Sequence, residues 1–264
     1  MILLGFDTAT PSTTVALRLA DGQMTQARDD PAPGEHPGHA TRLLALAHGL
    51  LAGAGVSWSA VERIAVGIGP GTFTGLRVGV ATARGLAQSL SAELVGVSSL
   101  EALAEAAFAG NAAADGGHAG DGRVTAPDSV LAVIDARRGE VFAAAYERAL
   151  DARCPAEIVP PSAVAPEQLA EVAAQAPPVG GERARRWLAV GDGALRFRDH
   201  LEMAAVPVAS ASSPLHLVHA EAICVLAARQ PAAAGYEEVL PDYRRRPDAE
   251  IALEAAAAGG AVRR

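Results

Sequence analysis

The segment that decides the fold reads Gly67-Ile68-Gly69-Pro70-Gly71-Thr72-Phe73-Thr74-Gly75-Leu76-Arg77-Val78-Gly79. Val61 to Gly67 predicts a strand that is buried around its apolar residues 64–66, and the residues from Leu76 to Leu90 predict a helix. A glycine-dense turn between the two is typical of an α/β unit. Thr72 or Thr74 can cap the helix, and the unpaired N–H groups at such a helix start can also hold an anion. Both the structural and the ligand-binding interpretation of this turn fit the residues.

The helix after the turn presents two different surfaces. Small residues recur at every fourth position, at Gly75, Gly79, Ala83 and Ala87. This stripe predicts close packing against another backbone. The remaining surface is mixed in character and carries Arg77, Val80, Ala81, Arg84 and Gln88. A mixed face of this kind favours contact with a partner protein.

Working outward toward the N-terminus, the sequence predicts a β-hairpin and then a helix. Ile2 to Phe6 ends at Asp7 and is followed by the hydroxyl-rich turn Thr8–Thr14 and an apolar run at 15–17, which together read as strand, turn and strand. After a polar loop, residues 40–51 predict a helix with apolar residues at Leu43, Leu44, Leu46, Ala47, Leu50 and Leu51. These positions cover an arc of roughly 160°, wider than one packing face needs, and the excess indicates a second partner surface.

Two domains fit the length of 264 residues. We expect an N-terminal α/β domain at 1–108, carrying the two helices described above, with a closing helix at 213–230 that packs back onto it. A second, smaller α/β domain is expected at 109–212, and it starts the way the first does, with a strand that ends at Asp135, a turn and another strand. Residues 254–264 are a low-complexity tail.

The composition excludes several classes of function. All 22 basic residues are Arg, so a P-loop lysine, a Schiff-base lysine and a kinase strand lysine are impossible. The formal charge of −8 disfavours direct binding to a nucleic-acid backbone by the chain alone. Two unpaired-looking cysteines and the lack of an apolar span predict a cytoplasmic protein without a membrane segment.

Asp7 with Thr8 and Thr10 forms a weak candidate for nucleotide binding. A carboxylate at a strand end, followed by hydroxyls and backbone N–H groups, can meet a metal and a phosphate. The alternative is a tight hairpin in which the Asp and Thr side chains bond to their own backbone. No glycine lies between Asp7 and Thr14, although phosphate loops usually contain one.

Seven histidines raise the question of a metal site. The pairs His36 with His39 and His216 with His219 are spaced three residues apart, but the first pair flanks Pro37 and Gly38, where no helix is expected. No third ligand is evident from the sequence, so we expect no metal site.

Several motifs together resemble the bacterial TsaB (YeaZ) family. They are the run from Gly67 to Gly79, Asp7-Thr8-Ala9-Thr10, Gly34-Glu35-His36, the segment 134–142 and Val239-Leu240-Pro241-Asp242-Tyr243. The match extends over nearly the whole chain, and the stretch Gly69-Pro70-Gly71-Thr72-Phe73-Thr74-Gly75 is its most specific part. The resemblance implies a two-domain actin-like ATPase (ASKHA) fold in a degenerate form.

The resemblance also implies a function. Members of this family are non-catalytic dimerisation subunits of the machinery that makes N6-threonylcarbamoyladenosine at position 37 of tRNA, and they pair with a TsaD-like transferase and a TsaE-like ATPase. The chain is also expected to form homodimers. Binding of tRNA and of ATP is expected only in the assembled complex. The partner interface is expected at His36, Leu43, Leu46, Leu50, Arg77, Val80 and Arg84.

One departure from the transferase relatives is readable in the sequence. Those relatives carry a metal-binding HxxxH motif, and at the matching place this chain has Ser99 and Leu103. Neither side chain supplies an imidazole, so the resemblance places the transfer chemistry on the partner. The alternative is an autonomous ATPase or a glycoprotease-like metallopeptidase.

Overall fold

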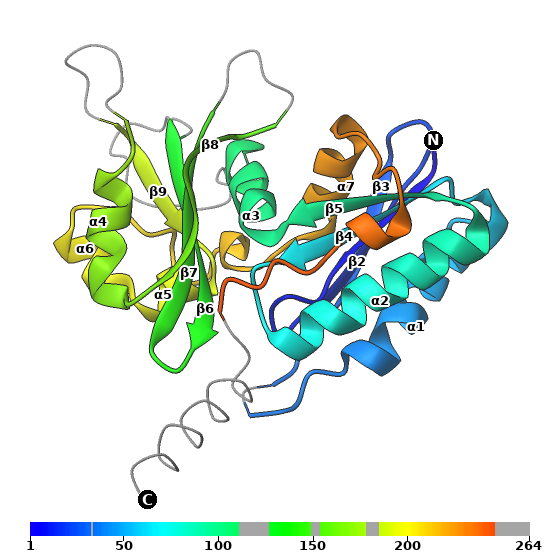
Figure 1. The fold of residues 1–264 in the computed structure, drawn as a ribbon, viewed down its shortest axis with the longest axis horizontal. Helices are drawn as coiled ribbons and strands as arrows, with labels where there is room; N and C mark the ends of the chain where they lie inside the picture. The colour runs from blue at the N-terminus through cyan, green and yellow to red at the C-terminus, as the bar shows by residue number, and fades with distance from the viewer. Residues whose placement is uncertain (33, 111–126, 149–153, 178–184, 246–264) are drawn as a thin grey trace, which may run out of the picture.

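The computed structural model describes residues 1–32, 34–110, 127–148, 154–177 and 185–245. Within them, strands and helices alternate over much of the chain, which confirms the α/β class predicted from the sequence. Two β-sheets form the centres of two lobes, and helices lie between the sheets and on their outer faces (Figure 1).

The first lobe contains a five-stranded sheet with the spatial order β3-β2-β1-β4-β5. The strands are β1 (Leu3–Asp7), β2 (Thr13–Arg18), β3 (Met24–Asp29), β4 (Arg63–Gly69) and β5 (Glu93–Ser98). The first three strands pair antiparallel, whereas β4 pairs parallel with both β1 and β5. Both faces of this sheet are covered, and β1 is accordingly buried along its whole length.

The second lobe repeats this arrangement with a four-stranded sheet in the order β8-β7-β6-β9. Its strands are β6 (Ser129–Arg137), β7 (Glu140–Glu147), β8 (Ala156–Val164) and β9 (Trp187–Val190). As in the first lobe, two antiparallel pairs are followed by a parallel pair, and the first sheet has one further parallel pair, β4–β5. The repeat of strand, turn and strand that the sequence indicated is therefore a repeat of sheet topology.

Seven α-helices are described, with short 3-10 turns between some of them. They are α1 (His39–Gly53), α2 (Phe73–Leu90), α3 (Ser99–Phe108), α4 (Leu169–Ala174), α5 (Asp192–Arg196), α6 (Arg198–Met203) and α7 (Ala220–Arg229). The turns are η1 (Trp58–Ala60), η3 (Pro166–Gln168), η4 (Pro214–His216) and η5 (Tyr236–Glu238). Helix α2 starts at Phe73, three residues before the predicted start, because Thr72 with its extended backbone is the N-cap.

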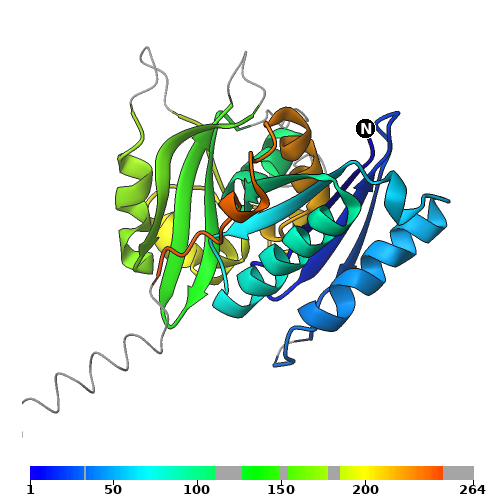
Figure 2. The same cartoon turned by 45° about the vertical axis from the view of Figure 1, so that its right-hand side comes forward.

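The helices divide the core into three layers of apolar side chains. One core, which includes Leu4 and Phe6 of β1, lies between the first sheet and the helices α1 and α2 (Figure 2). A central core joins the two sheets through α3 and α7, and a third covers the outer face of the second sheet. Gly5 lets α7 approach β1 closely, since a Cβ atom there would lie 2.6 Å from Sγ of Cys224.

The predicted domain limits are only partly within the described residues. The change of character at 109–126 and the tail at 254–264 lie mostly or entirely outside them, so the limits 1–108 and 109–212 stay a prediction. Within the described part, α7 packs against β1 and β2, and α3 contacts strands of both sheets. No helix in these residues combines the length and apolar character that a membrane crossing requires.

Candidate functional site

The glycine-rich turn packs directly on the first loop of the chain. The N–H of Thr72 donates to the carbonyl of Ala9 at 2.7 Å, and Oγ1 of Thr8 donates to the carbonyl of Gly75 at 2.8 Å. A Cβ atom on Gly71 would lie 2.3 Å from the carbonyl oxygen of Ala9, and one on Gly75 would lie 2.0 Å from that of Thr8. These glycines are thus required because two backbones touch there.

Asp7 is sealed beneath this turn. Its side chain is fully buried, its Oδ1 accepts the N–H of Ala9 at 2.8 Å, and its Oδ2 accepts the hydroxyl of Ser99 at 2.5 Å. Burial raises the pKa of Asp7, against the lowering effect of the two hydrogen bonds and of Arg28. Gly67 closes the site, since a Cβ atom there would lie 1.8 Å from Oδ2 of Asp7.

The three nucleotide-binding candidates lie inside the protein, and their role in binding stays a prediction. Asp7 and Thr8 are fully buried, and Thr10 is 9% exposed. The polar atoms of Asp7 and Thr8 bond to the chain's own backbone and to Ser99, because the turn has closed over the loop. Of these bonds only the one from the N–H of Ala9 to Asp7 is local to the hairpin, because Gly75 and Ser99 come from other parts of the chain.

The second lobe carries its own pair of aspartates, close to the start of α5. The N–H of Asp135 donates to Oδ1 of Asp192 at 3.0 Å, and Nη1 of Arg196 donates to Oδ2 of Asp135 at 2.6 Å. Burial raises the pKa of Asp192 to about 6, with the nearby charge of Asp135 adding to the effect. Within the described residues no three His, Cys, Asp or Glu side chains lie together as a metal site would need.

Two of the residues expected at the partner interface lie inside the protein instead. Leu43 is 1% exposed and Val80 is 3% exposed, and both belong to the core between the first sheet and the helices α1 and α2. The arc of apolar residues on α1 is therefore used in large part for intramolecular packing. Leu46 and Leu50 are half-buried, and His36 is exposed on the loop before α1.

One exposed leucine on α1 was not among the predicted interface residues. Leu44 is 47% exposed, although it lies next to the buried Leu43. It sits at the edge of the apolar arc, which is the signal that could have identified it. We call the partly exposed leucines Leu44, Leu46 and Leu50 the α1 face; Leu44 lies at one edge of the arc, and Leu46 and Leu50 lie on the other side of the buried stripe that includes Leu43 and Ala47.

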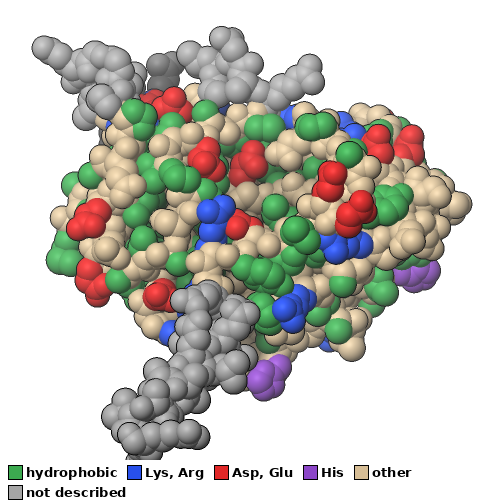
Figure 3. Space-filling model, in the orientation of Figure 1, with side chains coloured by type: hydrophobic (Ala, Val, Ile, Leu, Met, Phe, Trp, Pro, Cys, Tyr) green, Lys and Arg blue, Asp and Glu red, His purple; other side chains and the backbone are tan. Residues whose placement is uncertain are grey.

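The two arginines of α2 are engaged by the C-terminal part of the chain. Nε of Arg84 donates to the carbonyl of Val239 at 3.0 Å, and its Nη2 donates to that of Glu237 at 2.7 Å. Nε of Arg77 donates to the hydroxyl of Tyr243 at 3.0 Å. Figure 3 shows apolar and arginine side chains gathered where α2 meets this segment. A partner that contacts Arg77 or Arg84 would therefore meet the C-terminal segment as well.

Comparisons with known proteins place this geometry in a family. A family model described as "TsaD: tRNA N6-adenosine threonylcarbamoyltransferase" matches residues 35–253. A solved structure from Pseudomonas aeruginosa, described as an uncharacterized protein with similarity to peptidase YEAZ, is 30% identical; the match covers 92% of this chain and 99% of that one, with a TM-score of 0.69. The chain belongs to the TsaB (YeaZ) family. The two-domain actin-like ATPase fold expected from the resemblance is confirmed for this TsaB-family chain.

The names of curated relatives of this TsaB-family chain state a biosynthetic pathway. The "tRNA threonylcarbamoyladenosine biosynthesis protein TsaB" of Escherichia coli is 37% identical over 56% of this chain and 56% of its own length. The protein of the same name from Haemophilus influenzae is 34% identical over 54% of this chain and 52% of its own length. In these matches the chain spans about half the length of the curated relatives.

Proposed function

We propose that this TsaB-family chain is a non-catalytic subunit of the bacterial machinery that makes N6-threonylcarbamoyladenosine at position 37 of tRNA. In this proposal it pairs with a TsaD-like transferase and works with a TsaE-like ATPase, and it forms a homodimer when the transferase is absent. The names of its curated relatives support the pathway. The net charge of −8 supports binding of tRNA through the complex rather than by the lone chain.

The proposal that this chain docks onto a partner protein rests on the α1 face. Leu44 exposes 47% of its surface, on a helix whose inner side is already packed against the sheet. Apolar side chains left exposed on an outer helix next to a second helix are typical of an interface that is completed by another protein. Helices α1 and α2 lie together on this outer side of the first lobe (Figure 2).

The closed loop around Asp7 supports the non-catalytic part of the proposal. In this structure Asp7 is buried and bonded to Ser99, the residue that stands where the transferase relatives are expected to have a metal ligand. Leu103, at the second such position, is 1% exposed and packs in the central core. Neither Leu103 nor Ser99 offers an imidazole to a metal, and this supports assigning the transfer chemistry to the partner.

The test is a pair of matched substitutions of exposed apolar residues by aspartate. Leu44→Asp places a carboxylate in the proposed interface, and Met203→Asp makes the same change at a residue that is 80% exposed at the end of α6 in the other lobe. We expect Leu44→Asp to weaken pairing with the TsaD-like transferase by about tenfold or more, because a carboxylate buried without a partner is strongly unfavourable. Met203→Asp should pair like the unmodified chain.

Affinity is measured by sedimentation of the chain with and without the transferase, and circular dichroism checks that each variant is folded. Val80→Asp is unsuitable for this test because Val80 is a core residue. A variant there could lose pairing simply because it unfolds. Normal pairing by Leu44→Asp would remove the α1 face from the proposal. Rapid hydrolysis of ATP or peptide by the isolated chain would support the autonomous enzyme instead.

A further inference from the structure

Residues 210–219 carry the chain from the second lobe to α7, which packs on β1 and β2 of the first lobe. We call them the crossing segment. On the side of the second lobe, the N–H of Gly191 donates to the carbonyl of Leu215 at 3.1 Å. The ring nitrogen Nδ1 of His216 lies 2.9 Å from the carbonyl oxygen of Gly191. The middle of the crossing segment is thus tied to the turn between β9 and α5.

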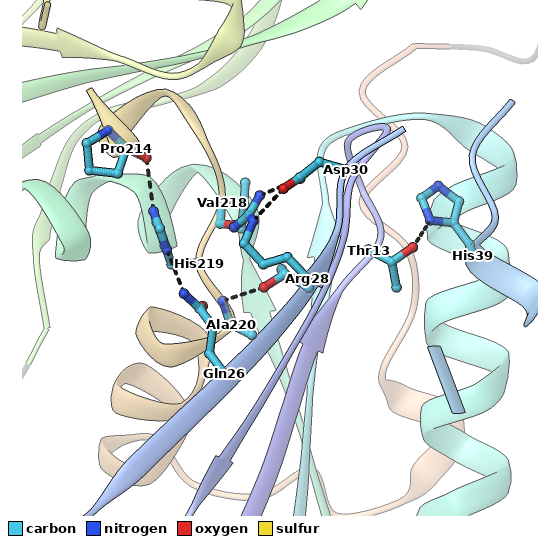
Figure 4. A network of polar contacts seen from close by, with 10 residues as sticks. Thr13, Gln26, Arg28, Asp30, His39, Pro214, Val218, His219 and Ala220 are labelled. Carbon is cyan, nitrogen blue, oxygen red and sulfur yellow. Dashed lines mark hydrogen bonds and ion pairs between the residues drawn. The ribbon is translucent and has the colours of Figure 1, made fainter. Parts of the chain in front are cut away.

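The end of the crossing segment is held by β3, the edge strand of the first sheet. Nη1 of Arg28 donates to the carbonyl of Val218 at 2.8 Å, and Nε2 of Gln26 lies 3.1 Å from Nδ1 of His219 (Figure 4). Both side chains reach from β3 to the residues just before α7. These contacts join the edge of the first sheet to the chain that links the two lobes.

The hydrogen positions on His219 follow from its neighbours. Nε2 lies 2.9 Å from the carbonyl oxygen of Pro214, which only accepts hydrogen bonds, so Nε2 carries the N–H. In a neutral ring Nδ1 is then an acceptor, and the amide of Gln26 must turn its NH2 group toward it. The neutral ring therefore fixes one of the two orientations of this amide.

The other end of the Gln26 amide is left unsatisfied by this orientation. Its Oε1 is buried and has no hydrogen-bond partner among the residues that the structure describes. A charged imidazole carries a hydrogen on Nδ1 as well, and it would need an acceptor where the NH2 group now lies. Half a turn of the amide places Oε1 there, so Gln26 can bond to either protonation state of His219.

The charged groups around His219 decide which state the fold favours. They are Arg28 and Asp30 on the side of β3 and Glu221 on α7, while His216 faces carbonyl oxygens on the side of the second lobe. Burial lowers the pKa of His219, the carbonyl at Nε2 raises it, Arg28 lowers it and the two carboxylates raise it. The net direction is downward, so the fold favours the neutral ring. A proton on His219 would place a second cation beside Arg28, whose own partner is Asp30.

We propose that His219, Gln26 and Arg28 form a pH-sensitive joint between the edge of the first sheet and the crossing segment. The joint is closed while the ring is neutral. When the ring gains a proton, the amide of Gln26 turns over, and repulsion between the two cations weakens the bond from Arg28 to the carbonyl of Val218. The joint therefore loosens as the pH falls. The inference stands on these contacts and does not depend on the proposed role in tRNA modification.

Two measurements on the full chain test the joint between about pH 5 and pH 8. Nitrogen NMR of the chain with isotope-labelled histidine reports which ring nitrogen of His219 carries hydrogen. Hydrogen exchange, corrected for the intrinsic effect of pH, reports the protection of residues 214–220. We expect hydrogen on Nε2 alone at the upper end of this range. Exchange should rise by about fivefold when His219 gains its proton, since the loss of one hydrogen bond corresponds to that factor.

Two pairs of matched variants assign the effect to the joint. Gln26→Glu places a carboxylate of the same shape at Nδ1, and it should raise the pH at which His219 gains its proton by about one pH unit or more. Gln23→Glu makes the same change at an exposed position just before β3, and it should shift this titration far less. His219→Gln should abolish the pH-dependent step in exchange, whereas His48→Gln, exposed on α1, should keep it.

Three results would overturn the proposal. The first is a neutral ring of His219 that carries its hydrogen on Nδ1. The second is equal titration of His219 in the two glutamate variants. The third is an exchange rate of residues 214–220 without a pH-dependent step in the unmodified chain, or with a step that persists in His219→Gln. Such persistence would assign the step to another group, such as His216.

Discussion

The hairpins β1–β2 and β6–β7 have the same pairing, but their aspartates have different surroundings. Asp7 is fully buried and bonded by an uncharged hydroxyl and a backbone N–H. Asp135 is 7% exposed and is ion-paired to Arg196 and Arg137, whose side chains are about half exposed. The difference shows that one topology can neutralise a strand-end carboxylate by enclosure or by pairing it with cations at the surface.

The largest expected effect concerns the enclosure in the first lobe. Gly75→Ala puts a methyl group 2.0 Å from the carbonyl oxygen of Thr8, and neither backbone can move without breaking the contact between turn and loop. We expect a loss of about 3 kcal/mol in the free energy of unfolding, measured by urea denaturation.

Gly85→Ala on the same helix is the matched control, because a Cβ atom there meets nothing within 4 Å. It should stabilise the chain by about 0.5–1 kcal/mol through helix propensity. Equal stability of the two alanine variants would contradict the close packing of α2 on the first loop.

The next effect concerns the pH dependence of the second lobe. The pKa of Asp192 is raised to about 6 in the folded state, so the folded chain keeps this proton to higher pH than the unfolded chain does. The resulting stabilisation is present below about pH 4 and is lost as the pH rises through 6. Asp192→Asn keeps the oxygen that accepts the N–H of Asp135 but cannot ionise.

We therefore expect Asp192→Asn to gain about 1–3 kcal/mol relative to the unmodified chain between pH 4 and pH 7. Urea denaturation at a series of pH values measures this, with the exposed Asp199→Asn as control. A difference between the two chains that does not change with pH would show that folding does not raise the pKa of Asp192.

The smallest effects compare the two aspartates directly. Ser99→Ala removes a buried hydroxyl from Asp7 and should lower stability by about 1–3 kcal/mol. Arg196→Gln removes a half-exposed cation while Arg137 still neutralises Asp135, and its effect should be below about 1 kcal/mol. Both are measured at neutral pH by urea denaturation, and a larger loss for Arg196→Gln would reverse our comparison of the two lobes.

Prediction from sequence was most accurate for regular elements with a clear period. The helix expected at 40–51 is α1 at His39–Gly53, and the strand, turn and helix around Gly69 are present. The interface residues were less accurate, since Leu43 and Val80 are core residues. A helical apolar arc gives the directions of side chains around the axis, but not which part of the arc the sheet covers.

The sequence by itself determined the α/β class and the repeated strand, turn and strand, because these follow from local period and turn chemistry. Only the tertiary structure decided that Asp7 is closed by Ser99, 92 residues away, and that Arg84 holds the backbone of Glu237 and Val239. The tertiary structure also decided that Thr74 and Arg137, which belong to different lobes, line one cavity. Such contacts join residues far apart in the chain, and no local pattern encodes which distant groups meet.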